Sequence, residues 1–200
     1  MQPKKERKDV IKSRLRILET AQSLFAEHGI NNITMRKIAT TAGIGQGTLY
    51  RHYAHKGEIC QDLIQESSQE FVDKVSSYLQ QNKEMSLQGK LVALIHYAVE
   101  FIDKHSNWLV YIQGPSCEEG QQIIYKSQVY NFLYAQVYEL IAASPSMQNN
   151  KDGDAGFRTD ALLATLTPDL YLFFKAQRGL THEKIKQHIV NLYINPLFQQ

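Results

Sequence analysis

The chain has 200 residues, of which 43% are hydrophobic and 21% are charged, as is ordinary for a globular protein. The charged start MQPKKERKDV lacks the apolar run of a signal peptide, and no segment approaches the roughly 18 apolar residues of a membrane span, so we expect a cytoplasmic protein that spans no membrane. The formal net charge is only +2, yet residues 1–56 carry eleven Lys and Arg against four Asp and Glu, a net +7, whereas residues 57–200 carry eleven against sixteen, a net −5. This asymmetry predicts that the first quarter of the chain meets a polyanion.

Apolar residues recur at spacings of three and four along the whole chain, which predicts an all-α protein of about nine helices. A first helix over residues 7–28 ends at Gly29, which suits the left-handed position just after a helix. Thr34 can cap a second, short helix, Gly43 permits a tight turn after it, and a third helix covers about residues 46–53. Two short helices joined by such a turn form a helix-turn-helix.

The rest of the chain reads as longer helices with one clear loop. Residues 144–156 are rich in Gly, Asn and Asp, which predicts a flexible loop, and Pro168 predicts a kink inside the helix that contains it. The helices expected after the helix-turn-helix cover about 56–79, 86–105, 108–112, 118–143, 157–176 and 181–192.

The segment GIGQGTLYRHYAHKGE, residues 43–58, is open to three interpretations. A dinucleotide-binding loop needs a third glycine where Thr48 stands, and a strand where a capped helix is predicted. A metal or catalytic cluster would use His52 and His55, but Glu58 is the only acidic residue near them. Cys60 and Cys117 form no CxxC pair, which argues against a cysteine zinc site.

The third interpretation is DNA binding. A recognition helix needs small residues in its first turn and a few polar side chains that reach the bases. Gly45 and Gly47 leave that room, and Gln46 between them can form two hydrogen bonds to an adenine. The polar residues that follow, Thr48, Tyr50, Arg51 and His52, carry groups suited to bases or phosphates, and a basic arm at Lys4, Lys5, Arg7 and Lys8 adds nonspecific attraction.

The segment TMRKIATTAGIGQGTLYRHY, residues 34–53, followed by KGEI at 56–59, resembles the DNA-binding signature of the TetR family of bacterial transcriptional regulators. The segment FAEHG at 25–29 is similar to the end of that family's first helix, and Gly45 departs from the serine or other small polar residue that is common there. The resemblance implies DNA contacts by Thr34, Arg36, Gln46, Gly47, Thr48, Tyr50, Arg51, His52 and Lys56, with Gln46 and Thr48 reading bases and Tyr50, His52 and Lys56 holding phosphates.

The resemblance also implies two domains, a helix-turn-helix domain at 1–55 and a ligand-binding and dimerisation domain at 56–200. Aromatic residues of the second domain are candidates to line a cavity, although each can equally be an ordinary core residue. These ligand-binding candidates are Tyr97, Phe101, Trp108, Tyr111, Tyr130, Tyr134 and Tyr138. The last two helices offer apolar candidates for a two-fold dimer interface, namely Leu162, Leu163, Leu166, Leu170, Phe173, Ile185 and Ile189.

The sequence thus favours a homodimeric repressor that binds a palindromic operator in double-stranded DNA and that a small hydrophobic or aromatic effector releases. We expect no enzymatic activity, no cofactor and no metal, because no base, acid and nucleophile share a motif and no cluster has metal-ligand spacing. Two alternatives remain open: a cytosolic α-helical enzyme that uses the aromatic cavity, and a module that coats DNA without sequence preference.

Overall fold

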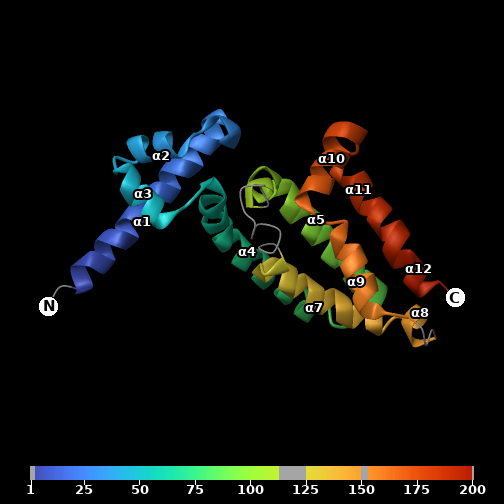
Figure 1. The fold of residues 1–200 in the computed structure, drawn as a ribbon. Helices are drawn as coiled ribbons and strands as arrows, with labels where there is room; N and C mark the ends of the chain where they lie inside the picture. The colour runs from blue at the N-terminus through green and yellow to red at the C-terminus, as the bar shows by residue number, and fades with distance from the viewer. Residues whose placement is uncertain (1–2, 113–124, 150–152, 200) are drawn as a thin grey trace.

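A computed structural model of the chain describes residues 3–112, 125–149 and 153–199, and all regular structure within these ranges is helical. The predicted all-α class is therefore confirmed. The N-terminal helices gather at one end of the molecule, and a long helix, α4, runs from them to the C-terminal helices (Figure 1). The elements are α1 Pro3–His28, η1 Ile30–Asn32, α2 Met35–Thr41, α3 Gln46–His52, α4 Lys56–Gln81, α5 Leu87–Ile112, α7 Gln128–Ala142, α8 Pro145–Gln148, α9 Ala155–Ala164, α10 Pro168–Arg178, α11 His182–Ile189, η2 Val190–Ile194 and α12 Asn195–Phe198.

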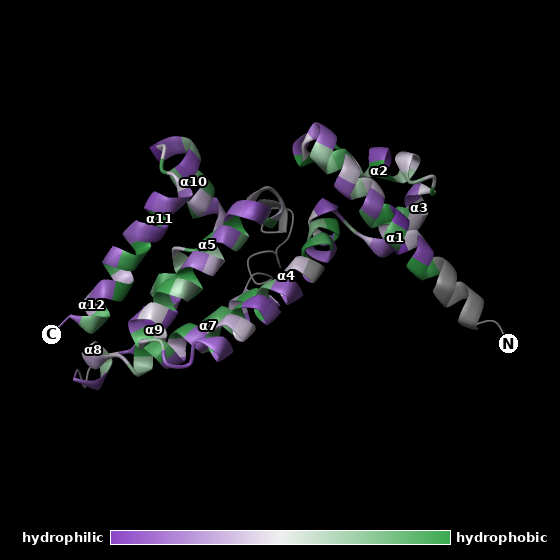
Figure 2. Ribbon diagram, turned by 180° about the vertical axis from the view of Figure 1, so that it is seen from behind, coloured by the Kyte–Doolittle hydropathy of each residue, from purple (hydrophilic) through white to green (hydrophobic). Residues whose placement is uncertain are grey.

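A first hydrophobic core joins α1, α2, α3 and the first half of α4. Leu49 of α3 is completely buried in this core, together with Ile17 and Ile38 from α1 and α2. Val10 and Ile11 of α1, by contrast, are exposed, because this part of the helix extends past the core. Hydrophobic and hydrophilic residues alternate along α1 and α4 in Figure 2, as expected of helices that bury one face.

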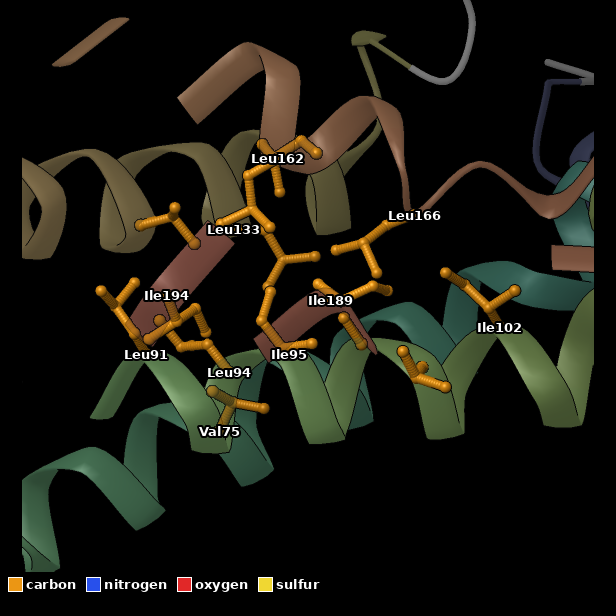
Figure 3. Packing of buried hydrophobic residues seen from close by; sticks show 14 of the residues in the cluster. Val75, Leu91, Leu94, Ile95, Ile102, Leu133, Leu162, Leu166, Ile189 and Ile194 are labelled. Carbon is orange, nitrogen blue, oxygen red and sulfur yellow. The ribbon is translucent and has the colours of Figure 1, made fainter. Parts of the chain in front are cut away.

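A second core fills the C-terminal half. Leu133 of α7 and Leu162 of α9 point toward Leu94 and Ile95 of α5 (Figure 3). The second half of α4 contributes Phe71 and Val75 to the same core, and α11, η2 and α12 close it through Ile185, Ile189, Ile194 and Leu197. Helix α4 therefore belongs to both cores, while the proposed division of the chain at residues 55 and 56 stays a prediction.

Two predicted breaks differ from the structure. The expected helices at 86–105 and 108–112 are one helix, α5, within which the hydroxyl of Ser106 donates to the Asp103 carbonyl one turn earlier. Pro168 does not kink a helix but begins α10 after a three-residue break. A proline fits the first turn of a helix, whose N–H groups have no partner in the helix in any case.

Three other predicted helix or loop boundaries also differ from those of the structure. Helix α7 begins at Gln128 because the Ser127 side chain accepts a hydrogen bond from the Tyr130 N–H, while the expected helical residues 118–124 lie outside the described ranges. The expected loop at 144–156 contains the one-turn helix α8. The last expected helix, 181–192, continues as a π-helical turn and then as α12, up to Phe198.

An ion pair with a tyrosine joins α5 to α10. Asp103 accepts hydrogen bonds from the Tyr171 hydroxyl at 2.6 Å and from the Lys175 ammonium at 2.7 Å. The hydrogen bond from Lys175, and then that from Tyr171, lower the pKa of Asp103 below its ordinary value. The carboxylate is thus favoured in the folded state.

We expect Asp103→Asn to destabilise the protein at neutral pH. A carboxyl group with a lowered pKa stabilises the fold fully above its unfolded pKa, about 4, and loses this effect as the pH falls through the folded value. Urea unfolding at several pH values should therefore show a difference from wild type that is constant above about pH 4 and shrinks below it. A difference that does not change with pH would contradict this role of the charge.

Candidate nucleic-acid interface and ligand cavity

The turn between α2 and α3 is held against α1. Gly43 has φ +63°, and a Cβ there would come within 3.0 Å of the Arg16 guanidinium. That guanidinium donates to the Ala42 carbonyl at 2.6 Å. The turn therefore needs a glycine both for its backbone conformation and for this contact.

Helix α3 buries Leu49 and carries its polar side chains around the rest of its surface. Gln46 is its first residue and is exposed, as are Tyr50 and Arg51. Thr48 and His52 are half-buried, and the Thr48 hydroxyl accepts a hydrogen bond from the Arg51 guanidinium at 3.2 Å. The structure thus brings the predicted readers of α3 together on one short helix, with Leu49 as its anchor in the core.

The two glycines around Gln46 have no role in the folded protein itself. Gly45 has an ordinary φ of −67°, and a Cβ on Gly47 would meet no other atom within 4 Å. Neither backbone strain nor packing demands glycine here, although glycine lowers helix stability by about 1 kcal/mol relative to alanine. The open space beside them is on the outside of α3.

Helix α2 carries the two remaining predicted contacts of the helix-turn-helix. The Thr34 hydroxyl caps α2 by accepting the Lys37 N–H at 3.1 Å, and it retains its own proton for a further bond. Arg36 lies in the first turn of α2 and is exposed. The side chains of the predicted basic arm lie outside what the structure describes.

Lys56 lies differently from the other predicted contacts. Its ammonium donates to the carbonyls of Ile30 and Ile33, at 2.8 Å each, and thereby holds the segment between α1 and α2 in place. The side chain is half-buried and turns into the domain. The structure therefore gives the charge of Lys56 a structural partner that the sequence did not reveal.

One polar contact that sequence reasoning missed joins three helices. Asp62 of α4 accepts the Tyr53 hydroxyl at 2.5 Å and the Arg14 Nε at 2.8 Å. Burial, and then the hydrogen bond to Asp62, raise the pKa of Tyr53 far above its usual value. Tyr53 is the residue that ends α3, so this contact fixes the end of the recognition helix. No local pattern announces it, because the partners are 9 and 48 residues apart.

A cavity of about 380 Å³ lies among α4, α5, α7 and the start of α10. Its wall is apolar on α5 and α7, through Phe101, Ile102 and Leu133, and polar on α4, through Asp62 and Gln65. Such a mixed wall and this size are usual for sites that bind small molecules.

Two of the seven aromatic candidates, Phe101 and Tyr130, contribute to this wall. Tyr97 instead contacts Tyr78 of α4 with ring centroids 5.3 Å apart, and Trp108 packs against the N-terminal core. Tyr130, Tyr134 and Tyr138 do form one stacked row on α7, but only the first lies beside the cavity. The side chain of Tyr111 lies outside what the structure describes.

The dimer candidates prove to be mostly interior residues. Leu162, Leu163, Leu166, Ile185 and Ile189 are buried in the C-terminal core of the single chain, Leu170 is half-buried, and Phe173 is exposed. Two large apolar side chains outside this candidate set are more exposed than Phe173: Phe157 of α9 is 71% exposed and Leu192 of η2 is 68% exposed. Helical periodicity identified the apolar stripe on these helices but did not show whether the stripe faces the core of its own chain or a partner.

Two further observations apply to residues 3–112, 125–149 and 153–199 only. No group of three His, Cys, Asp or Glu side chains in these ranges is arranged to hold a metal ion. No helix within the same ranges is long and apolar enough to cross a membrane.

Residues 17–63 match the model of the bacterial regulatory proteins of the tetR family. A helix-turn-helix-type transcriptional regulator of Staphylococcus aureus is 30% identical over 189 residues, which cover 94% of this chain and 96% of the relative. The chain belongs to the TetR family. The predicted resemblance is confirmed, and the protein is a DNA-binding transcriptional regulator of a family that is not enzymatic.

Solved structures of TetR-type regulators show the same fold along the whole chain. FadR of Thermus thermophilus, a TetR-family repressor solved in complex with lauroyl-CoA, has a TM-score of 0.69 at 16% identity, with 94% of this chain and 96% of that chain covered. A transcriptional regulator from Saccharomonospora viridis, solved in complex with choline, has a TM-score of 0.64 at 19% identity, with coverages of 94% and 99%.

We expect Gly47→Ala to stabilise the protein and to weaken its binding to DNA. The added methyl group meets no protein atom and favours the helix by up to about 1 kcal/mol, but it stands on the outside of α3. Urea unfolding and titration with a cognate duplex measure the two effects. Ser77→Ala, on an exposed face of α4, is the control that should leave DNA affinity unchanged. Equal DNA affinities of Gly47→Ala and wild type would show that α3 does not approach DNA closely at this position.

Proposed function

We propose that the protein is a homodimeric repressor that binds a palindromic operator and leaves it when a small amphipathic effector fills the cavity. The observation that carries this proposal is that exposed polar side chains of α3 surround two positions, Gly45 and Gly47, at which the fold does not require glycine. This arrangement does not stabilise the free protein, whereas it allows a recognition helix to enter a major groove closely.

Within this proposal, Gln46 and Thr48 read bases and Arg51 supports Thr48. Tyr50 and His52 hold phosphates on either side of the groove, and Thr34 and Arg36 of α2 contact the backbone or a flanking base. Lys56 contributes by holding the chain before α2 in place, because its ammonium already binds two carbonyls of that segment.

The second copy covers an apolar face formed by α9 and the C-terminal segment. Phe157 and Leu192 stand beside a shallow hollow of about 130 Å³ whose wall also contains Ala161, Tyr193 and Pro196. Exposure of two such large apolar side chains to water costs free energy. A two-fold axis beside them would bury Phe157 and Leu192 of both protomers in one interface. Phe173 and Leu170 of α10 stay candidates for the edge of the interface.

The effector is expected to combine an apolar body with a polar group. The α5 and α7 walls of the cavity offer apolar contacts, and Gln61, Asp62, Gln65 and Ser68 of α4 offer hydrogen bonds. The related structures in complex with lauroyl-CoA and with choline support a small-molecule effector of this general kind. Gln128 of α7 bonds Gln69 of α4 at 2.7 Å beside the cavity, so filling it would act directly on α4.

Gln46→Ala should reduce sequence specificity more than total DNA affinity. Duplexes enriched by the wild-type protein from a random pool supply the cognate sequence, and a scrambled duplex supplies the comparison. Loss of a bidentate contact to a base costs about 1–3 kcal/mol on the cognate duplex and little on the scrambled one. Gln80→Ala, exposed near the end of α4, is the matched control. Equal losses on both duplexes would exclude Gln46 as a base reader.

Leu192→Asp and Phe157→Asp should each shift the protein from dimer to monomer. A carboxylate at either position would be buried without a partner in the interface, and this disfavours association strongly. Sedimentation velocity measures the change, and Leu15→Asp, which alters an exposed leucine on α1, should leave the dimer intact. Dimers of unchanged stability in both variants would place the interface elsewhere.

A further inference from the structure

Asp62 takes part in two features at once. Its side chain belongs to the polar wall of the cavity, and its carboxylate is the acceptor that holds Tyr53 and Arg14. The Asp62 carboxylate thus joins a residue of the cavity wall to the residue that follows α3.

The three partners come from three different helices. Arg14 lies in the middle of α1, Tyr53 ends α3, and Asp62 lies in the second turn of α4. Both the Arg14 guanidinium and the Tyr53 hydroxyl bind the same carboxylate oxygen, Oδ2. A rotation of the Asp62 side chain therefore breaks both bonds together or moves both partners with it.

Tyr53 transmits such a movement to the recognition helix. Its ring is buried in the N-terminal core, and its N–H closes α3 on the Leu49 carbonyl at 2.9 Å. Leu49 is in turn the buried anchor of the helix that carries the predicted base readers. The hydroxyl of Tyr53 thus forms a polar link from the cavity wall to the end of α3.

We propose that Asp62 is a positioning residue that couples the cavity to the recognition helix. This inference rests on the proposed function, since it assigns the route by which cavity occupancy alters DNA binding. A molecule in the cavity shifts Asp62, Asp62 releases or displaces Tyr53 and Arg14, and the end of α3 loses its fixed position. An alternative route exists on α5, where Trp108 and Leu109 pack against the N-terminal core, and the experiment separates the two.

The test uses operator DNA alone, because coupling between two sites is reciprocal. If the cavity acts on α3 through Asp62, binding of DNA to α3 must alter the cavity wall through the same residue. Hydrogen–deuterium exchange of the full-length protein, free and saturated with the enriched duplex, reports the wall through peptides that cover residues 61–68. We expect exchange there to change by about fivefold or more in the wild-type protein, the lower end of usual couplings.

The decisive variant is Asp62→Asn, with Asp103→Asn as its matched control. Asp103 also binds a tyrosine hydroxyl and a basic side chain through one carboxylate, but neither Asp103 nor its partners belong to the cavity wall or to the N-terminal core. Both variants should be less stable than wild type. With the duplex at saturation and α3 protected, only Asp62→Asn should lose the DNA-induced change in exchange at residues 61–68.

Tyr53→Phe provides a second variant that keeps the Asp62–Arg14 pair and removes only the link to α3. Tyr53→Phe should reduce the DNA-induced change in exchange at residues 61–68, and it should speed exchange in residues 46–53 of the free protein. A full response in Tyr53→Phe would overturn Tyr53 as the link, and a full response in Asp62→Asn would overturn the proposal and favour the route through α5. Failure to enrich any duplex would instead count against the proposed function itself.

Discussion

Helix α4 contributes buried residues to both hydrophobic cores, so the way in which this helix is held constrains communication between the two halves. Its first half packs on Leu49 and Tyr53 of the DNA-binding end, and its second half packs on α5 and α7. Its N-terminus is capped by His55, whose ring accepts the Glu58 N–H at 3.3 Å, while the Glu58 side chain accepts the Ala54 N–H. A helix fixed at its start and bordered by a cavity farther along can carry a small displacement without unfolding either core.

The basic groups of the N-terminal quarter divide into two kinds. Arg14, Arg16 and Lys56 are used inside the domain, where each binds a carboxylate or backbone carbonyls between helices. Arg36 and Arg51 remain at the surface beside the recognition helix. The net +7 of this segment therefore overstates the charge that acts on DNA, because part of it stabilises the helix-turn-helix itself. A lysine or arginine near a recognition motif is thus no sufficient sign of a phosphate contact.

Local rules were enough to predict the helices of the DNA-binding half. A capping threonine, a glycine with positive φ and a regular apolar spacing are all encoded within a few residues, so the helices around Thr34 and Gly43 fall where the sequence places them. The C-terminal half was harder because its contacts are distant in sequence. Leu162 and Ile189 look alike as apolar helix residues whether they face a core or a partner, and only the packing of α5, α7 and α11 distinguishes the two.

The cavity illustrates the same limit. Its wall combines residues from about 61 to 168, so aromatic residues chosen by type included Tyr97 and Trp108, which pack elsewhere, and missed Asp62 and Gln65. Asp62 in particular carries no local signal, since its role follows from lying between a cavity and the end of α3. Its assignment required the three-dimensional arrangement of α1, α3 and α4.

Hydroxyl-radical footprinting on the enriched duplex tests the central claim most directly. A two-fold dimer whose α3 helices enter successive major grooves should protect two segments related by a palindrome, with centres about 34–36 Å apart. The protection should appear at one defined position and should weaken with Gln46→Ala. Continuous protection along the duplex, without a sequence preference or a two-fold centre, would contradict the account.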